Sequence, residues 1–272
     1  MTEDIIKVII LALVEGVTEF LPVSSTGHLI VGRSLLGLNG MGAVFEIFIQ
    51  FGAVVAVVIY YRKTLYGQSA KLSSSPETRR FWSLVALSCL PAATLGFLAG
   101  ERIGQVLFSP QVVAVSLIVG GVVFLLVERL PNFQLRESDQ GSITRITARQ
   151  ALTVGLVQVL ALIPGVSRSG SSIIGGILSG LDRRQATEYS FFLAIPLLGG
   201  ATLYRLAIVI HTLDAGELFL LLLGAALSAV FAWLSIEWPL RFVSNNSFDV
   251  FGYYRIIAGL LILAAVSSGL IS

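Results

Sequence analysis

Charged residues are scarce in this sequence, and their scarcity excludes the commonest class of protein. Only 12% of the 272 residues are Asp, Glu, Lys or Arg, whereas 55% are hydrophobic. A soluble globular domain carries about 25% charged residues. A large soluble protein would also need many amphipathic surface helices, and the sequence contains almost none. The composition therefore predicts an integral membrane protein.

Cysteine and histidine are equally scarce. Cys89 is the only cysteine, so no disulfide can form within the chain, and we expect a buried free thiol. The two histidines, His28 and His211, do not have the spacing of a zinc site. A net charge of +2 is too small to indicate a nucleic-acid partner, and we expect none. Glu3 and Asp4 stand where a secretory signal peptide would be basic, so we expect no such signal.

Six apolar segments are long enough to cross a bilayer, whose hydrocarbon core of about 30 Å needs about 20 apolar residues. These predicted transmembrane helices lie at about 42–61, 81–100, 111–127, 186–210, 217–236 and 250–271. The sequence thus predicts an all-α integral membrane protein, with one membrane domain over residues 1–272.

Two further apolar regions are interrupted by proline, glycine and serine. Residues 5–21 precede the break P-V-S-S-T-G and the short run 28–38, and residues 148–163 precede P-G-V-S-R-S-G and the run 171–181. Each half is too short to span a bilayer comfortably. We therefore predict two re-entrant helical hairpins, whose broken backbone must be surrounded by protein or line a water-filled cavity.

The two interrupted regions occupy matching places in the chain. An ungapped offset aligns Ser25 with Ser167, and three spanning segments follow each break. Because three is odd, the second half enters the membrane from the opposite side. This predicts an inverted-topology repeat, with repeat one at about 1–130 and repeat two at about 147–272. Interrupted helices at corresponding positions of such repeats indicate the binding site.

The basic residues predict the orientation of the chain. If the six crossings are right, 12 of the 18 basic residues fall on one side, chiefly in stretches 62–80 and 129–149. The opposite connections, 101–110 and 211–216, hold only Arg102. The positive-inside rule then places the basic loops in the cytoplasm and both termini outside.

The first break carries acids, hydroxyls and an imidazole in E-G-V-T-E-F-L-P-V-S-S-T-G-H, residues 15–28. Glu15 and Glu19 share one helix face, and carboxylates facing lipid would each cost a few kcal/mol, so we expect them to face a polar interior. Such a pair suits a hard cation, Mg²⁺ or Ca²⁺. The other polar side chains of the motif are Ser24, Ser25, Thr26 and His28. Alternatively, the hydroxyls only cap a helix and the acids bond neighbouring helices.

The second break, P-G-V-S-R-S-G-S-S at 164–172, carries a cation. Arg168 has a planar guanidinium suited to bidentate phosphate binding, at the start of a helix whose dipole also favours anions. Four serines can donate hydrogen bonds beside it: Ser167, Ser169, Ser171 and Ser172. The motif predicts a phosphate cradle. Alternatively, Arg168 pairs with Glu15 or Glu19 for structure alone, and both interpretations can hold at once.

Several other polar residues in apolar segments are harder to interpret. Glu46 and Gln50 share one helix face and either support the site or stabilise the fold. Arg205, Glu237 and Arg255 lie near predicted helix ends, where long side chains snorkel toward the membrane surface.

The two motifs resemble those of the bacitracin-resistance type of undecaprenyl-diphosphate phosphatase, and the resemblance covers essentially the whole chain. It implies hydrolysis of a C55 polyprenyl diphosphate lipid to the monophosphate and phosphate, which recycles the lipid carrier for cell-wall synthesis. It also implies a divalent cation and a bacterial cytoplasmic membrane location, with a site open to the outer face. Homodimers are compatible with it.

The resemblance also implies roles for individual residues. Glu15 and Glu19 become the essential acids, Ser25 and His28 the active-site hydroxyl and imidazole, and Arg168 the phosphate clamp. Ser24, Thr26, Ser167 and Ser172 become supporting residues. The nucleophile stays open between Ser25 and a water. A transporter or flippase for an anionic lipid is the alternative function, because inverted repeats with broken helices are typical of transporters.

Overall fold

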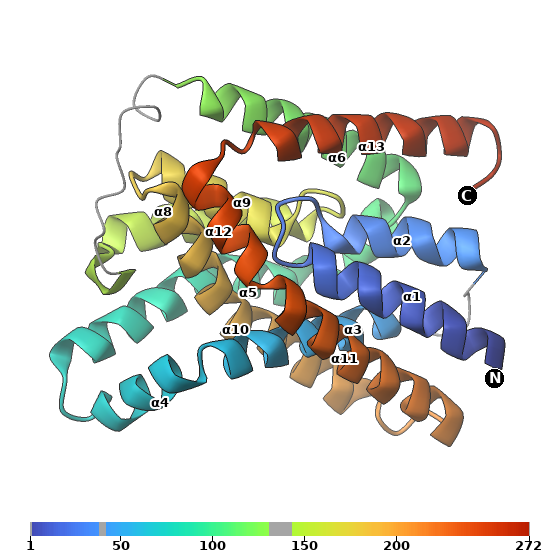
Figure 1. The fold of residues 1–272 in the computed structure, drawn as a ribbon. Helices are drawn as coiled ribbons and strands as arrows, with labels where there is room; N and C mark the ends of the chain where they lie inside the picture. Colours follow the sequence, from blue (N-terminus) through green and yellow to red (C-terminus); the bar gives the residue numbers. More distant parts are fainter. Residues whose placement is uncertain (1, 38–41, 131–142, 272) are drawn as a thin grey trace.

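The computed structural model is an assembly of helices (Figure 1). It describes residues 2–37, 42–130 and 143–271, and over these ranges it contains no strand. Residues 131–142, which belong to the second predicted basic stretch, lie outside the described residues. The prediction of an all-α protein is confirmed.

Six long helices match the six predicted segments. They are α3 (Gly42–Tyr60), α5 (Pro76–Leu107), α6 (Pro110–Glu128), α10 (Arg183–Val209), α11 (Ala215–Ser235) and α13 (Asp249–Ser267). Five spans are long and apolar enough to cross a membrane, and α3 makes a sixth when it is counted with α4 (Arg62–Lys71), from which it is bent by 72°. The prediction of a multi-pass membrane protein is confirmed at this level.

The outer surfaces of the long helices are covered by large apolar side chains. Leu90, Phe97 and Leu98 of α5 are 58%, 71% and 73% exposed, and Leu222 of α11 and Leu261 of α13 are 57% and 66% exposed. Soluble monomers rarely expose large continuous apolar patches. A surface of this kind is stable in contact with lipid.

Both interrupted regions form a helix, a break and a second helix. The first consists of α1 (Thr2–Thr18) and α2 (Ser25–Leu36); the second consists of α8 (Ala148–Gln158), the 3-10 turn η2 (Val159–Leu162) and α9 (Arg168–Leu178). In each region the two helices lie against each other (Figure 1). The chain therefore turns back on itself at each break.

Helices of the first half pack directly against helices of the second half. The pairs in contact include α1 with α11, α3 with α11, α5 with α8, and α6 with α13. Glycines allow these close approaches: a Cβ on Gly52 of α3 would lie 2.1 Å from the Ala225 carbonyl oxygen of α11. On Gly121 of α6 it would lie 2.6 Å from the Gly252 carbonyl oxygen of α13. This interlocking brings the two breaks together in the interior.

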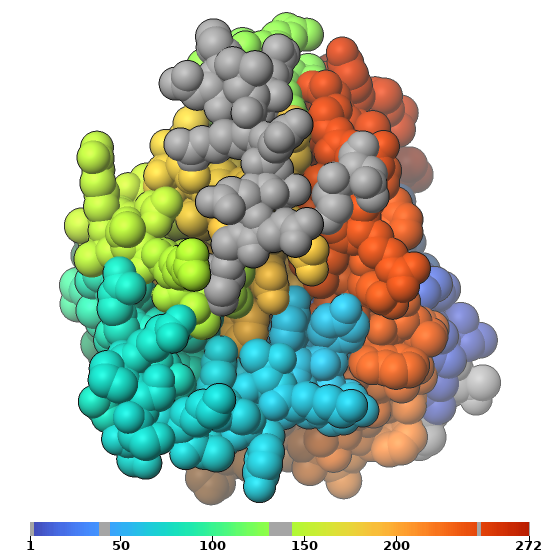
Figure 2. All heavy atoms as spheres, turned by 60° about the vertical axis from the view of Figure 1, so that its left-hand side comes forward, coloured from blue at the N-terminus to red at the C-terminus, as the bar shows by residue number. Residues whose placement is uncertain are grey.

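One end of the molecule gathers the basic segments. Figure 2 looks onto α4, the start of α5, the turn η1 (Ile143–Arg145) and α12 (Glu237–Asn245). The basic side chains of the first three segments are exposed: Arg62, Lys63, Lys71, Arg79, Arg80 and Arg145. The described part of the predicted basic loops is therefore concentrated on one face.

Candidate active site

The helices that follow the two breaks begin in the same way. Ser24 caps α2 and Ser167 caps α9, and their φ angles of 70° and 79° are left-handed, which is uncommon for residues other than glycine. Each serine oxygen accepts a hydrogen bond from the backbone N–H of a glycine three residues later, Gly27 at 3.3 Å and Gly170 at 3.0 Å. The two helices therefore begin with the same kind of serine cap.

Glu19, in the first break, joins the two halves of the site. Its Oε2 accepts a hydrogen bond from Ser25 Oγ at 2.5 Å, and its Oε1 lies 2.8 Å from Arg168 Nη2 in an ion pair. Ser25 and Arg168 are the first residues of α2 and α9, so both capped helices aim at one carboxylate. The predicted approach of an acid from one half to the guanidinium of the other is present.

The remaining contacts of Arg168 fix the plane of its guanidinium. Nη1 donates to the carbonyl oxygen of Ser190 at 2.7 Å and to its hydroxyl oxygen at 3.1 Å. Ser172 Oγ donates to the same Ser190 hydroxyl oxygen at 2.7 Å. Ser190, a buried residue of α10, was not predicted; a serine within the apolar run E-Y-S-F-F-L is the only signal that the sequence offers.

The other predicted supporting residues connect elements of the site. Ser169 Oγ donates to the Leu21 carbonyl oxygen at 2.8 Å and so ties α9 to the first break. Thr26 Oγ1 accepts from Gln50 Nε2 of α3 at 3.0 Å. These hydroxyls therefore hold the two breaks against each other and against α3.

Glu15 differs from Glu19 in its surroundings. It is fully buried one turn earlier on α1, close to Glu19 and Ser25, and neither carboxylate oxygen makes a hydrogen bond within the described residues. A buried carboxylate without a partner is costly unless it holds a proton or a cation.

The acid pair can contribute to a divalent-cation site. Mg²⁺ is commonly held by one or two carboxylates, with substrate phosphates and water completing its shell. No group of three or more acidic, histidine or cysteine side chains forms a metal site in the described part of the chain. A cation at Glu15 and Glu19 would therefore depend on oxygen atoms of the substrate and of water.

His28 lies on α2 but turns away from the acids. Its Nδ1 lies 2.7 Å from the Ser24 carbonyl oxygen, and its Nε2 lies 2.6 Å from the hydroxyl of Tyr254 on α13. Among the described residues, no hydrogen bond joins it to Glu15 or Glu19. His28 is close to Ser25 in the sequence, but its imidazole bonds Tyr254, a partner that was not predicted.

Arg255 corrects an expectation drawn from the sequence. The prediction that it snorkels to the membrane surface is wrong, because its side chain is fully buried. Its guanidinium donates to the Pro22 carbonyl oxygen of the first break and to the Gly165 and Val166 carbonyl oxygens of the second, at 3.0, 3.0 and 3.1 Å. Space for it exists because a Cβ on Gly120 of α6 would lie 2.1 Å from Nη2. Arg255 therefore fastens the two breaks together.

Glu46 pairs with a cation of its own. Its Oε1 lies 3.0 Å from Arg33 Nη1, which joins α3 to the end of α2. Glu46 is buried, whereas the Arg33 side chain is partly exposed. This contact gives Glu46 a structural role, while Gln50, one turn later, supports the site through Thr26.

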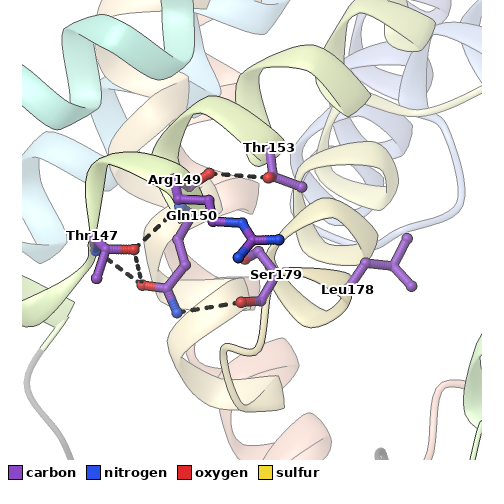
Figure 3. A pocket seen from close by; sticks show the side chains of 6 residues that line it. All are labelled: Thr147, Arg149, Gln150, Thr153, Leu178 and Ser179. Atoms are coloured by element: carbon purple, nitrogen blue, oxygen red, sulfur yellow. Dashed lines mark hydrogen bonds between the residues drawn. The ribbon is translucent and has the colours of Figure 1, made fainter.

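A hollow of about 430 Å³ lies elsewhere, at the start of α8 (Figure 3). Its lining consists of Thr147, Arg149, Gln150, Thr153, Leu178 and Ser179. The Gln150 side chain accepts from the Thr147 N–H at 2.9 Å and donates to the Ser179 carbonyl oxygen at 3.5 Å. These bonds cap α8 and connect it to the end of α9. None of the predicted site residues lines the hollow.

The fold and the site together define a class: a multi-pass helical membrane protein in which two broken helices join buried acids to a guanidinium. A family model described as bacitracin resistance protein BacA matches residues 8–261, and the chain belongs to that family. This confirms the resemblance drawn from the motifs.

Similar proteins cover nearly the whole chain. Undecaprenyl-diphosphatase 1 of Burkholderia lata is 47% identical over 266 residues, which is 97% of this chain and 96% of the relative. Undecaprenyl-diphosphatase of Acidovorax ebreus is 45% identical over 269 residues, 98% of this chain and 97% of the relative. The protein of the same name from Albidiferax ferrireducens is 44% identical over 269 residues.

Proposed function

We propose that this chain is a membrane phosphatase that hydrolyses undecaprenyl diphosphate to undecaprenyl phosphate and inorganic phosphate. It thereby recycles the lipid carrier used in cell-wall synthesis. The observation that carries the proposal is the convergence of Ser25 and Arg168 on Glu19, in a chain whose relatives are named for this activity. A nucleophile bonded to a base, beside a phosphate-binding cation, is the arrangement that phosphoryl transfer requires.

The unpartnered atoms of the site support a position for the phosphates. Arg168 Nε and both oxygens of Glu15 are buried without hydrogen-bond partners among the described residues. The free N–H of Arg168 can donate to a phosphate oxygen, while Nη1 and Nη2 hold the side chain in place. The terminal phosphate would lie between Arg168 and Ser25, and the polyprenyl tail would extend between helices toward lipid.

The contacts support Ser25 as the nucleophile. Ser25 Oγ attacks the terminal phosphorus and passes its proton to Glu19 Oε2, to which it is already bonded. The bond to the bridging oxygen breaks, and undecaprenyl phosphate leaves as the anion. A water then attacks the phosphoserine and gives its proton to His28, while Glu19 returns its proton to the departing Ser25 Oγ; inorganic phosphate and free Ser25 result. Direct attack by water is the second route.

A divalent cation, Mg²⁺ or Ca²⁺, belongs to this proposal. When bound, it would neutralise the charge of the diphosphate and of the leaving group. Glu15 and Glu19 would hold it, because Glu15 has two free oxygens and each Glu19 oxygen keeps a second lone pair.

We also propose the inverted-topology repeat, with both broken regions re-entrant, the basic loops cytoplasmic, the termini outside and the site open to the outer face. The matched contacts of α1 with α11 and of α8 with α5 support the repeat. The shared cap geometry of Ser24 and Ser167 supports it independently. The homodimer and the lack of a nucleic-acid partner stay predictions.

Purified protein in detergent, supplied with undecaprenyl diphosphate, tests the proposal. We expect one phosphate to be released per lipid, and roughly 100-fold slower release from an Arg168→Lys variant that elutes like wild type. Absence of release from wild type, together with transfer of the lipid across proteoliposome membranes, would contradict the enzyme and favour the transporter.

A further inference from the structure

The hydroxyl of Tyr254 occupies the only nitrogen of His28 that is free to exchange a proton. The Ser24 carbonyl oxygen, 2.7 Å from Nδ1, can only accept, so Nδ1 must carry a hydrogen. In the neutral ring Nε2 then has only a lone pair, and Tyr254 O–H donates to it over 2.6 Å. The contacts of His28 therefore select one tautomer of its imidazole.

The same two residues also fix the plane of the imidazole. The His28 and Tyr254 rings stack with an angle of 11° between their planes and 5.7 Å between their centroids. With a hydrogen bond at each nitrogen and a ring on one face, the imidazole has little freedom to rotate. Hydrogen-bond partners on the ring determine which nitrogen of a histidine is available.

The position of Tyr254 is itself fixed by its neighbour in α13. Arg255 bonds the carbonyl oxygens of both breaks and is fully buried, so it fixes the position of α13 against the two breaks. Tyr254 precedes Arg255 in the same turn of α13, and its hydroxyl bonds His28 Nε2. α13 thus carries a tyrosine–arginine pair that connects the imidazole to the two breaks.

We infer that Tyr254 is a positioning residue for His28: it fixes the plane of the ring whose Nδ1–H tautomer the Ser24 carbonyl sets, and so directs proton exchange at Nε2. The inference rests on the proposed function, in which His28 takes a proton from water during hydrolysis of the phosphoserine. The water's proton moves to Nε2 and its hydroxide oxygen bonds to phosphorus, as Ser25 Oγ leaves and takes back the proton held by Glu19. This step requires the Tyr254 hydroxyl, on a residue that is 43% exposed, to leave Nε2 so that the water can bind there.

Nitrogen NMR of histidine-labelled protein tests the inference without any substrate. The chain has only two histidines, so a His211→Asn background leaves the ring of His28 as the single imidazole signal. In the protein that keeps Tyr254, we expect His28 to show a protonated Nδ1 and an unprotonated, hydrogen-bonded Nε2. Tyr254→Phe should shift the Nε2 signal, because Nε2 loses its hydrogen bond, while the Ser24 carbonyl keeps Nδ1 protonated. Tyr253→Phe should change neither signal. Tyr253 is half exposed and bonds no described residue through its hydroxyl.

Steady-state kinetics provide the second readout. Loss of one hydrogen bond at the imidazole should lower kcat about tenfold and leave KM within about twofold. Tyr253→Phe should match wild type, and equal melting temperatures of the two variants exclude a folding defect. An unchanged NMR spectrum or an unchanged kcat in Tyr254→Phe overturns the inference. Failure of wild type to release phosphate instead contradicts the proposed function, because the NMR signals report the hydrogen bond independently of turnover.

Discussion

Glu19 Oε1 lies 2.8 Å from Arg168 Nη2, which joins residues 149 positions apart in the chain. Both side chains are nearly buried, at 5% and 9% exposure. Removing one member of a buried pair leaves an uncompensated charge, which typically costs about 3–5 kcal/mol. The contact therefore commits the two halves of the chain to one site.

Replacing Arg168 by lysine should separate charge from geometry. Arg168 reaches Glu19 and Ser190 with different nitrogens, whereas an ammonium is a single point of charge. We expect Arg168→Lys to fold and to release phosphate roughly 100-fold more slowly, as loss of charged hydrogen bonds predicts. Arg184→Lys, at an exposed position of α10, is the matched control. A rate near wild type would remove Arg168 from the mechanism.

Ser25→Ala should reveal the nucleophile. With its hydroxyl bonded to Glu19, Ser25 is ready to attack, and its loss should lower turnover by about 10³-fold. Rapid acid quenching of wild type during turnover should trap a phosphoserine that mass spectrometry locates at residue 25. Ser83→Ala on the exposed face of α5 controls for loss of a hydroxyl. Substantial turnover by Ser25→Ala would instead indicate attack by water.

Chelation should stop the reaction if the buried acids hold a cation. We expect no phosphate release in excess EDTA and full recovery with Mg²⁺ or Ca²⁺. Glu15→Gln keeps the shape of the side chain but removes the charge, so it should need at least about tenfold more cation for half-maximal rate. Glu101→Gln, at an exposed position of α5, should behave like wild type. Full activity after exhaustive chelation would refute the metal.

Disturbing Arg255 should weaken the fold and the site together. Arg255→Gln leaves carbonyl oxygens of both breaks without a charged donor, and each unsatisfied buried group costs about 1–3 kcal/mol. Gly120→Ala should resemble it, because the new Cβ would lie 2.1 Å from Arg255 Nη2. We expect both variants to melt several degrees lower in detergent, as about 1 kcal/mol shifts a melting point by a few degrees.

The matched control for Gly120→Ala is Gly100→Ala. An added Cβ at Gly100 of α5 meets no atom within 4 Å, so that variant should melt at or slightly above the wild-type temperature. Equal melting temperatures for the Gly120 and Gly100 variants would show that Arg255 has room to move and does not fasten the breaks.

Cysteine labelling should report the orientation. In a Cys89→Ser background, Gly67→Cys on α4 and Gly104→Cys near the end of α5 introduce thiols where an added Cβ meets nothing within 4 Å. If the basic end is cytoplasmic, a membrane-impermeant thiol reagent should label the Gly104→Cys variant in intact cells and the Gly67→Cys variant only after permeabilisation. The reverse pattern would invert the proposed topology.

The sequence predicts the helices and the central contact of the site because both follow from the cost of polarity in lipid. Long apolar runs locate α5, α6, α10, α11 and α13, and a lone guanidinium in an apolar region must find a partner such as Glu19. Ser190 and Arg255 were not predicted as site residues. Ser190 bonds the Arg168 side chain, and Arg255 bonds backbone oxygens of the two breaks. Such contacts depend on where the chain bends in space, and the spacing of residues in the sequence does not predict them.

The direction of His28 was missed for a related reason. Ser25 and His28 are three residues apart on α2, which suggests a shared face, but the imidazole reaches past the helix to Tyr254. A tyrosine near the end of an apolar segment is usually an interfacial aromatic, so the sequence alone gives Tyr254 no role in the site. Only the folded structure, in which the Tyr254 side chain of α13 meets the His28 side chain of α2, reveals the pairing.

The dependence of both breaks on Arg255 also constrains how the protein is made. A ribosome delivers Glu15 and Glu19 to the membrane long before Arg168, and Arg255 only with the last helix described, α13. Until then, the carbonyl oxygens of Pro22 and Gly165 have no guanidinium to bond. The catalytic centre therefore cannot form until α13 has been synthesised. A chain truncated before α13 should be degraded by quality-control proteases and should have no partial activity.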